Sequence, residues 1–201
     1  MGNFYTNTTL KGPDRHSIVR AIDRMRRAAA VTPSQADLTV VFDRESERQD
    51  GSAYPFVERL TRELDCLALY VTNHDDSVLY YRLYGSGEII DQYDSCPNYF
   101  EGDPVPPEGG DAQVLCDALG VPAARDTVHE ILHYDRYAAA NDGARRYAWE
   151  VERHADLARA LGLPLWAVGF GYTYLASGDW PEGLSQENIM SLTGEGGGTT
   201  K

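Results

Sequence analysis

The spacing of apolar residues predicts alternating strands and helices over the first third of the chain. Residues 3–10 show the alternation of a strand, and residues 38–42 form a short apolar run that predicts a second one. Apolar residues at helical spacing follow Pro13 and again follow Pro55. Proline is favoured in the first turn of a helix, where its missing N–H leaves no hydrogen bond unmade, so two helices are expected there.

Three further strands are predicted in the centre of the chain, over residues 66–72, 78–84 and 88–93. The separators, residues 73–76 and 85–87, are rich in the Asn, Asp, Ser and Gly that form tight turns. The three runs therefore predict an antiparallel meander. Its many tyrosines are ordinary strand residues, but its exposed face is also a candidate interface because tyrosine is enriched in binding surfaces.

The second half of the sequence is typical of helices. Helices are expected over residues 111–119, from Pro122 to about Tyr137, over residues 143–161, and from Pro164 to Gly178. Residues 166–174 also fit a buried strand, so helix and strand both stay open for them. Residues 193–201 are rich in Gly and Thr, have little to bury and are expected to be a disordered tail.

These elements predict an α+β fold. The expected architecture is a mixed, largely antiparallel sheet of about five strands in the order βαβαβββ, with helices packed on it and a helical C-terminal part. One domain is expected over residues 1–192, with residues 1–94 as the sheet-forming half and residues 111–192 as the mainly helical half. A content of 42% hydrophobic residues is enough for one core of this size.

The charge is negative and unevenly distributed. The chain has 31 acidic and 18 basic side chains, a formal charge of −13, which argues against a general nucleic-acid binder. Residues 1–30 carry +4, so the rest of the chain carries −17. This asymmetry favours a dipolar protein whose acidic side docks a basic protein partner, the alternative being a solvated helix that pairs with acidic neighbours.

The three cysteines and the apolar segments indicate a cytoplasmic protein. Cys66, Cys96 and Cys116 form no C-x-x-C pair, and their odd number favours reduced thiols. The sequence shows no secretory leader and no run of about 18 apolar residues, so no membrane contact is expected. Cys96 is a candidate nucleophile if His74 activates it, although a structural role is the preferred interpretation.

One motif points to enzymatic chemistry. His129-Glu130-Ile131-Leu132-His133 matches H-E-x-x-H, in which two histidines on one helix face bind zinc and the glutamate is the general base. A third ligand is needed, and Glu150 and Glu152 lie 17 and 19 residues after the second histidine. The motif therefore supports a zinc-dependent hydrolase as an alternative function.

The helical wheel weakens that alternative. The apolar residues of the segment occupy one stripe, so both histidines are expected on the solvated side, flanked by Arg125 and Arg136. Cationic neighbours disfavour a bound zinc ion. In the preferred interpretation no catalytic, cofactor or metal residue is assigned, and His154 is expected to be packed in the core.

Several short segments carry a resemblance. The residues Gly-Asn-Phe-Tyr-Thr-Asn at 2–7, Asn-His-Asp-Asp at 73–76, Asp-Ser-Cys-Pro at 94–97, Leu-Gly-Leu-Pro at 161–164 and Trp-Ala-Val-Gly at 166–169 resemble an uncharacterised family of small cytosolic proteins from high-GC bacteria. The resemblance spans nearly the whole chain. It implies no activity and no functional residues, and the H-E-x-x-H motif is not part of its pattern.

Together these observations favour a non-enzymatic bacterial binding protein over the zinc hydrolase. The most concrete form is an immunity- or inhibitor-type protein whose acidic surface neutralises a basic effector such as a nuclease toxin. Mimicry of DNA charge is a third possibility. The sequence assigns neither the binding face nor the oligomeric state.

Overall fold

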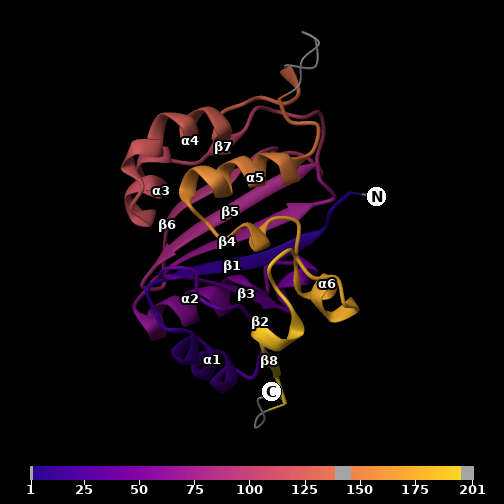
Figure 1. The fold of residues 1–201 in the computed structure, drawn as a ribbon. Helices are drawn as coiled ribbons and strands as arrows, with labels where there is room; N and C mark the ends of the chain where they lie inside the picture. The colour runs from indigo at the N-terminus through magenta and orange to yellow at the C-terminus, as the bar shows by residue number, and fades with distance from the viewer. Residues whose placement is uncertain (1, 139–145, 196–201) are drawn as a thin grey trace.

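The computed structural model describes residues 2–138 and 146–195, and within them a single eight-stranded sheet (Figure 1). The strands are β1 (Tyr5–Lys11), β2 (Ala28–Val31), β3 (Leu38–Asp43), β4 (Leu67–His74), β5 (Val78–Gly85), β6 (Glu88–Asp94), β7 (Glu108–Gly109) and β8 (Met190–Thr193). Their order across the sheet is β7-β6-β5-β4-β1-β3-β2-β8, and every strand pair in these residues is antiparallel.

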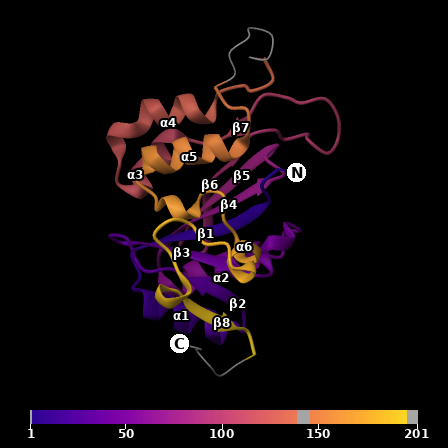
Figure 2. The same cartoon turned by 45° about the vertical axis from the view of Figure 1, so that its right-hand side comes forward.

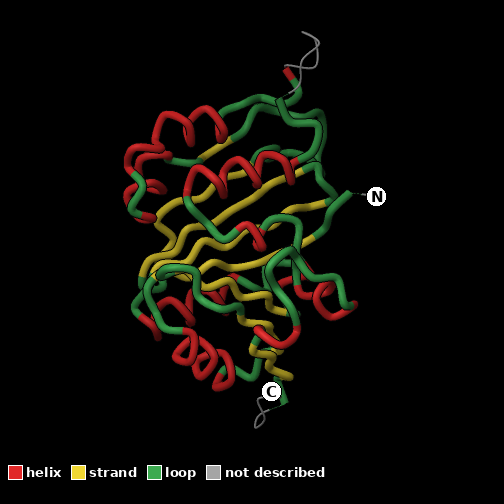
Figure 3. The backbone as a smooth tube through the Cα atoms, in the orientation of Figure 1, coloured by secondary structure: helices red, strands yellow, loops and turns green. Residues whose placement is uncertain are grey.

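Six α-helices flank the sheet within the described residues (Figure 3). They are α1 (Arg15–Arg24), α2 (Tyr54–Leu64), α3 (Ala112–Leu119), α4 (Arg125–Leu132), α5 (Glu150–Leu161) and α6 (Tyr172–Ser177). Local chemistry sets several of their ends. The Asp111 side chain accepts hydrogen bonds from the first N–H groups of α3, and Gly120 ends that helix with a φ of 80°.

The alternation of side chains along the strands separates two layers of core. Ala68 and Tyr70 of β4 pack against α1 and α2 on one face, whereas Leu69 and Val71 pack on the other face in the core that contains α3, α4 and α5. Figure 2 shows α3, α4 and α5 grouped at one end of the sheet. On their face, towards β2 and β3, a third cluster joins Phe42 to the segment that carries α6.

The meander is confirmed, and its first turn is tight. β4, β5 and β6 pair as consecutive antiparallel neighbours. Between β4 and β5, Asp75 and Asp76 both have positive φ, at 52° and 54°. Three residues, 75–77, connect the paired His74 and Val78, and Asp and Asn tolerate the left-handed backbone of this turn better than most residues.

The α+β class and the largely antiparallel sheet are confirmed, but the expected number of about five strands is wrong, and the pairing is antiparallel throughout the described strands instead of mixed. The missed strands are β2, β7 and β8. β2 is Ala-Ala-Ala-Val, and alanine has little strand propensity, so its place depends on pairing with β3 and β8. β8 includes Thr193, which was expected in the tail; residues 196–201 lie outside the described part of the chain.

Three helix predictions also need correction. α4 ends at Leu132 instead of near Tyr137, and Pro122–Ala124 is a short 3-10 helix, η2. In place of the expected helix or strand at residues 166–174, the chain forms a 3-10 helix, η4 (Leu165–Ala167), then bends at Gly169, whose φ is 80°, before α6. α5 begins at Glu150, later than the expected residue 143, and residues 139–145 are outside the described ranges.

None of the helices in the described ranges has the length and apolar character to cross a membrane.

Candidate functional site

The residues of the H-E-x-x-H motif lie at the exposed end of α4. His129 and Glu130 are exposed on the last turn, and His133 is the exposed residue that follows the helix. The two imidazole rings stack with their centroids 4.2 Å apart, and the His133 Nδ1 lies 3.0 Å from the backbone oxygen of His129. The expectation that both histidines are solvated is confirmed.

The two expected third ligands have other partners. Glu152 is exposed, and its Oε2 accepts hydrogen bonds from the N–H groups of Ala148 and Trp149, which caps its own helix. Glu150 is buried and forms an ion pair. Within residues 2–138 and 146–195, no three His, Cys, Asp or Glu side chains come together in an arrangement that could hold a metal ion. The structure therefore gives the zinc hypothesis no support.

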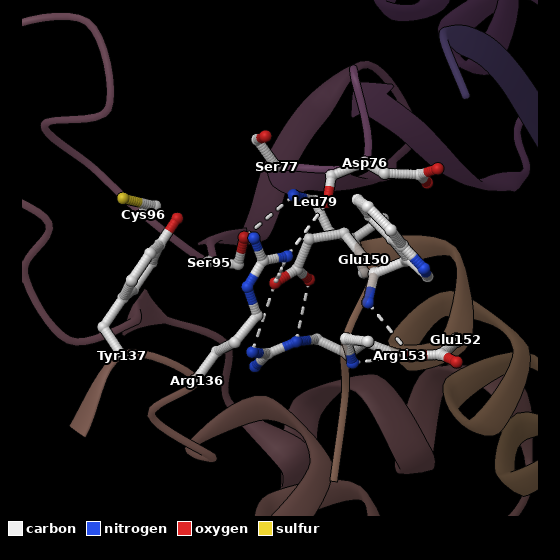
Figure 4. A network of polar contacts seen from close by, with 12 residues as sticks. Asp76, Ser77, Leu79, Ser95, Cys96, Arg136, Tyr137, Glu150, Glu152 and Arg153 are labelled. Carbon is white, nitrogen blue, oxygen red and sulfur yellow. Dashed lines mark hydrogen bonds and ion pairs between the residues drawn. The ribbon is translucent and has the colours of Figure 1, made fainter. Parts of the chain in front are cut away.

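Arg153 is the centre of a buried polar network that joins α5 to the end of α4 (Figure 4). It is fully buried, and its Nε lies 2.9 Å from the Glu150 Oε2. Its Nη1 donates to the backbone oxygens of Ile131 and Leu132 at 3.1 and 3.3 Å. A longer α4 would use these oxygens for its own hydrogen bonds, so Arg153 explains why the helix stops at Leu132.

Arg136 completes the network from the other side of Glu150 (Figure 4). Its Nη1 donates to the backbone oxygen of Asp76 at 2.9 Å and lies 3.5 Å from the Glu150 Oε1. Arg136 was expected beside the histidines, but it lies beyond the end of α4 and turns inward. Burial raises the pKa of Glu150, and the two guanidinium groups oppose that rise. The network ties the β4–β5 turn to the helical layer.

His154, expected in the core, is 1% exposed, which confirms that prediction. Its Nδ1 lies 2.7 Å from the Tyr5 hydroxyl, and burial lowers the pKa of His154 to about 4. Asn73 connects this pair to the hairpin turn, because its Nδ2 donates to the Asp76 Oδ1 at 3.2 Å. The neutral histidine and its neighbours form a rigid support for the fold.

The cysteines are free and buried, in agreement with reduced thiols. Burial raises the pKa of Cys96, which keeps its thiol protonated, and Figure 4 shows it beside Tyr137. His74, the residue expected to activate Cys96, instead contacts Gln49, with its Nδ1 2.8 Å from the Gln49 Oε1. The structure brings no activating base to Cys96 among the described side chains.

A hollow with a volume of about 600 Å³ lies beside α4. Three carboxylates, of Asp91, Asp111 and Asp126, line it against one guanidinium, that of Arg125, together with His129 and His133. The Tyr81 hydroxyl donates to the Asp91 Oδ2 at 2.6 Å, and Asp111 caps α3, so two of the carboxylates are held in place. Asp126 is exposed at the start of α4. This arrangement offers negative charge in a concave site, which suits a cationic group.

Neither the buried Arg153 nor the acidic hollow is among the residues and sites predicted from the sequence. Arg153 occupies an inward position of α5, but a charged residue there gives no apolar signal. The hollow was detectable only in part, as a run of acidic residues without basic ones between residues 88 and 124. The carboxylates of the hollow come together only because β6, β7, α3 and α4 are neighbours in the folded chain.

No family model matches this sequence, and neither the curated proteins nor the solved structures include a match to it.

Proposed function

We propose that this protein acts by binding, and that the acidic end formed by residues 88–135 receives a basic protein partner. One observation carries the proposal: this stretch holds eleven Asp or Glu side chains and a single basic one, Arg125, and thus −10 of the formal charge of −13. An inhibitor- or immunity-type role towards a basic effector is the form of binding that this charge favours.

The fold gathers these charges at one end of the molecule. The stretch comprises β6, β7, α3, α4 and their connections, which form one edge of the sheet and the helices over it (Figure 1). Eight of its carboxylates are exposed: Glu88, Glu101, Asp103, Glu108, Asp111, Asp117, Asp126 and Glu130. Such a concentration steers a cationic partner by long-range attraction that salt screens within about 10 Å.

The opposite end has the opposite character. α1 and the turn after it present Arg20, Arg24 and Arg26 at the surface. Arg24 forms an ion pair with Glu63 of α2, which neutralises part of this positive charge. A molecule with such a dipole orients a charged partner before contact, and this favours fast, salt-sensitive association.

The hollow beside α4 gives the acidic end a shape as well as a charge. Its volume of about 600 Å³ is ample for a lysine or arginine side chain, and Asp126 and Asp111 stand at its wall. A partner that inserts one cation there would gain specificity that a flat acidic surface does not offer.

The test uses two triple variants that remove the same charge at different ends. Glu108→Gln, Asp126→Asn and Glu130→Gln neutralise the acidic end, whereas Asp179→Asn, Glu182→Gln and Glu187→Gln neutralise exposed carboxylates near α6. Binding of a deca-lysine peptide is measured by calorimetry at low and at physiological salt. The first variant is expected to bind about tenfold more weakly than the second, with the difference shrinking in salt.

Equal binding by the two triple variants would sink the proposal, since only net charge would then matter. Circular dichroism and urea unfolding of both variants establish that they are folded before the comparison is made. None of the six carboxylates forms an ion pair with another residue of the described ranges, so both variants are expected to fold.

A further inference from the structure

A second hollow, of about 430 Å³, lies on the face of the sheet that α1 and α2 cover. Its lining includes side chains from two neighbouring strands, Tyr70 and His74 of β4 and Tyr80 and Arg82 of β5. These side chains point to the same face of the sheet as Ala68 and Tyr84, which pack beneath α2. Tyr54, the first residue of α2, forms one wall. The helix therefore covers one part of this face and leaves the next part open as a groove.

One side of the groove is a cluster of aromatic rings around His74. The rings of Phe4 and Phe100 meet the imidazole edge-on, with centroids 5.1 and 5.0 Å away, and Tyr99 lies next to Phe100 at 4.9 Å. Phe100 is 77% exposed and Phe4 is 37% exposed. Large exposed aromatic rings gathered at one concave site are a surface on which a planar ligand can stack.

The other side of the groove carries a cation with no counter-ion. The Arg82 guanidinium lies 3.6 Å above the ring of Tyr54, and its Nε donates a hydrogen bond to the Tyr80 hydroxyl. Among the described residues, no carboxylate comes within ion-pair distance of Arg82. The Arg82 guanidinium is therefore held by aromatic groups and is free to form charge-assisted hydrogen bonds with an anionic ligand.

His74 adds a directed polar group. The Gln49 Nε2 donates to the backbone oxygens of Tyr5 and Asn73, at 3.3 and 3.0 Å, which fixes the orientation of its amide. The Gln49 Oε1 must then accept from the His74 Nδ1, which is 2.8 Å away. In the neutral imidazole the proton therefore resides on Nδ1. The Nε2 remains as an acceptor for a ligand hydroxyl or amino group.

We propose that this groove binds a small planar aromatic anion, with its ring among Phe4, His74 and Phe100 and its anionic group on Arg82. The volume lies in the range of about 300–1,000 Å³ that small-molecule sites occupy. Asp94 is the carboxylate of the lining, and its Oδ1 is engaged by the N–H of Cys96. Asp94 and Phe100 belong to the stretch 88–135, but Glu108, Asp126 and Glu130, the carboxylates changed in the acidic-end variant, do not line this groove, so either proposal can fail without the other.

The test compares four probes by calorimetry with the full chain. Adenosine monophosphate and 4-hydroxybenzoate both combine an aromatic ring with an anionic group. The probe that binds more tightly shows whether the natural ligand is a nucleotide or an aromatic carboxylate. Adenosine has no anionic group and inorganic phosphate has no ring, so both are expected to bind at least about tenfold more weakly. Failure of both ring-bearing anions to bind below about 1 mM overturns the proposal, as does equal binding of adenosine.

Matched variants locate the site. Arg82→Met is expected to weaken binding of the tighter probe about tenfold or more, whereas Arg59→Met, an equal charge change on the exposed side of α2, leaves it unchanged. Asp94→Asn keeps the acceptor for the Cys96 N–H and is expected to strengthen binding several-fold, a gain that misfolding cannot imitate. Equal binding by the Arg82 and Arg59 variants, or weaker binding by Asp94→Asn, refutes the assignment.

Discussion

The Tyr5 hydroxyl of β1 and the Nδ1 of His154 in α5 are 2.7 Å apart in the core, and their rings stack at 5.7 Å. Burial raises the pKa of Tyr5, so the phenol keeps its proton and its hydroxyl donates a hydrogen bond to the imidazole Nδ1. Because burial lowers its pKa, His154 is neutral, with the proton on Nε2, which has no hydrogen-bond partner among the described residues. A charged imidazole at this position would be buried without compensation.

This pair predicts an acid-sensitive fold. The pKa of His154 is 6.5 in an unfolded chain and about 4 in the protein, so the unfolded state takes up its proton first as pH falls. The stability from this group is complete above pH 6.5 and is lost between pH 6.5 and 4, at about 1.4 kcal/mol per pH unit and about 3 kcal/mol in all. Urea unfolding at a series of pH values measures the loss.

His154→Gln is the control for this prediction, because an amide can accept the Tyr5 hydrogen bond without titrating. The variant is expected to lose less stability between pH 6.5 and 5 than the unmodified protein. Parallel pH profiles for the two proteins would show that the acid sensitivity comes from other groups.

The buried network predicts a large effect at Arg153. Arg153→Met removes the closer of the two guanidinium partners of Glu150 and the arginine donor to the Ile131 oxygen, so the free energy of unfolding is expected to fall by about 3–5 kcal/mol. Arg159→Met, on the exposed side of the same helix, breaks a surface pair with Asp156 and is expected to cost less than about 1 kcal/mol.

The double variant Glu150→Gln with Arg153→Met refines this test. It removes both buried charges, so it is expected to be more stable than Arg153→Met alone. Chemical unfolding of the unmodified protein, Glu150→Gln, Arg153→Met and the double variant measures the coupling energy between the two side chains. Losses of similar size at Arg153 and Arg159 would contradict the structural role given to the network.

Gly171 is predicted to tolerate no side chain. Glu47 of η1 (Ser46–Arg48) is largely buried, and its Oε1 accepts the N–H of Tyr172 at 2.9 Å, which caps α6. A Cβ at Gly171 would lie 2.0 Å from that oxygen. Gly171→Ala is expected to reduce the free energy of unfolding by about 1–3 kcal/mol, measured in urea.

Gly102→Ala provides the comparison, since a Cβ there meets nothing within 4 Å and the backbone is not left-handed. It is expected to leave stability unchanged or to raise it slightly by restricting the unfolded chain. An equal loss at both glycines would mean that the contact with Glu47 is not the cause.

We expect the H-E-x-x-H segment of the protein to bind no zinc. Because Glu150 and Glu152 are engaged elsewhere, His129→Ala with His133→Ala is expected to change neither the thermal midpoint in equimolar zinc nor the zinc content of protein purified without chelator. Elemental analysis measures the zinc content, and one zinc per chain that the double variant loses would restore the hydrolase hypothesis.

Some elements were predictable because one local signal determined them. The meander followed from alternation and turn residues, and α3 from its start at Asp111 and its end at Gly120. β2 was not predictable in this way, because Ala-Ala-Ala-Val has no strand pattern and its conformation comes from β3 and β8 on either side.

The candidate sites were less accessible to sequence reasoning. The inward side of α5 mixes Glu150, Arg153 and His154 with Leu157, so hydrophobic periodicity does not show which charges are buried. The tyrosines of the meander were recognised as a candidate interface, but the uncovered face depends on where α2 begins. Tyr80 faces the groove whereas Tyr81 is buried on the opposite face.

The position of β8 has a consequence for synthesis on the ribosome. β2, made from residues 28–31, has its outer edge completed only by residues 190–193. While the chain is being made, the N-terminal strands can pair, but β2 keeps an apolar, unpaired edge until the last strand leaves the exit tunnel. Unpaired strand edges recruit other chains, so the nascent protein is most exposed to aggregation during this interval, and a truncation before residue 190 would make that exposure permanent.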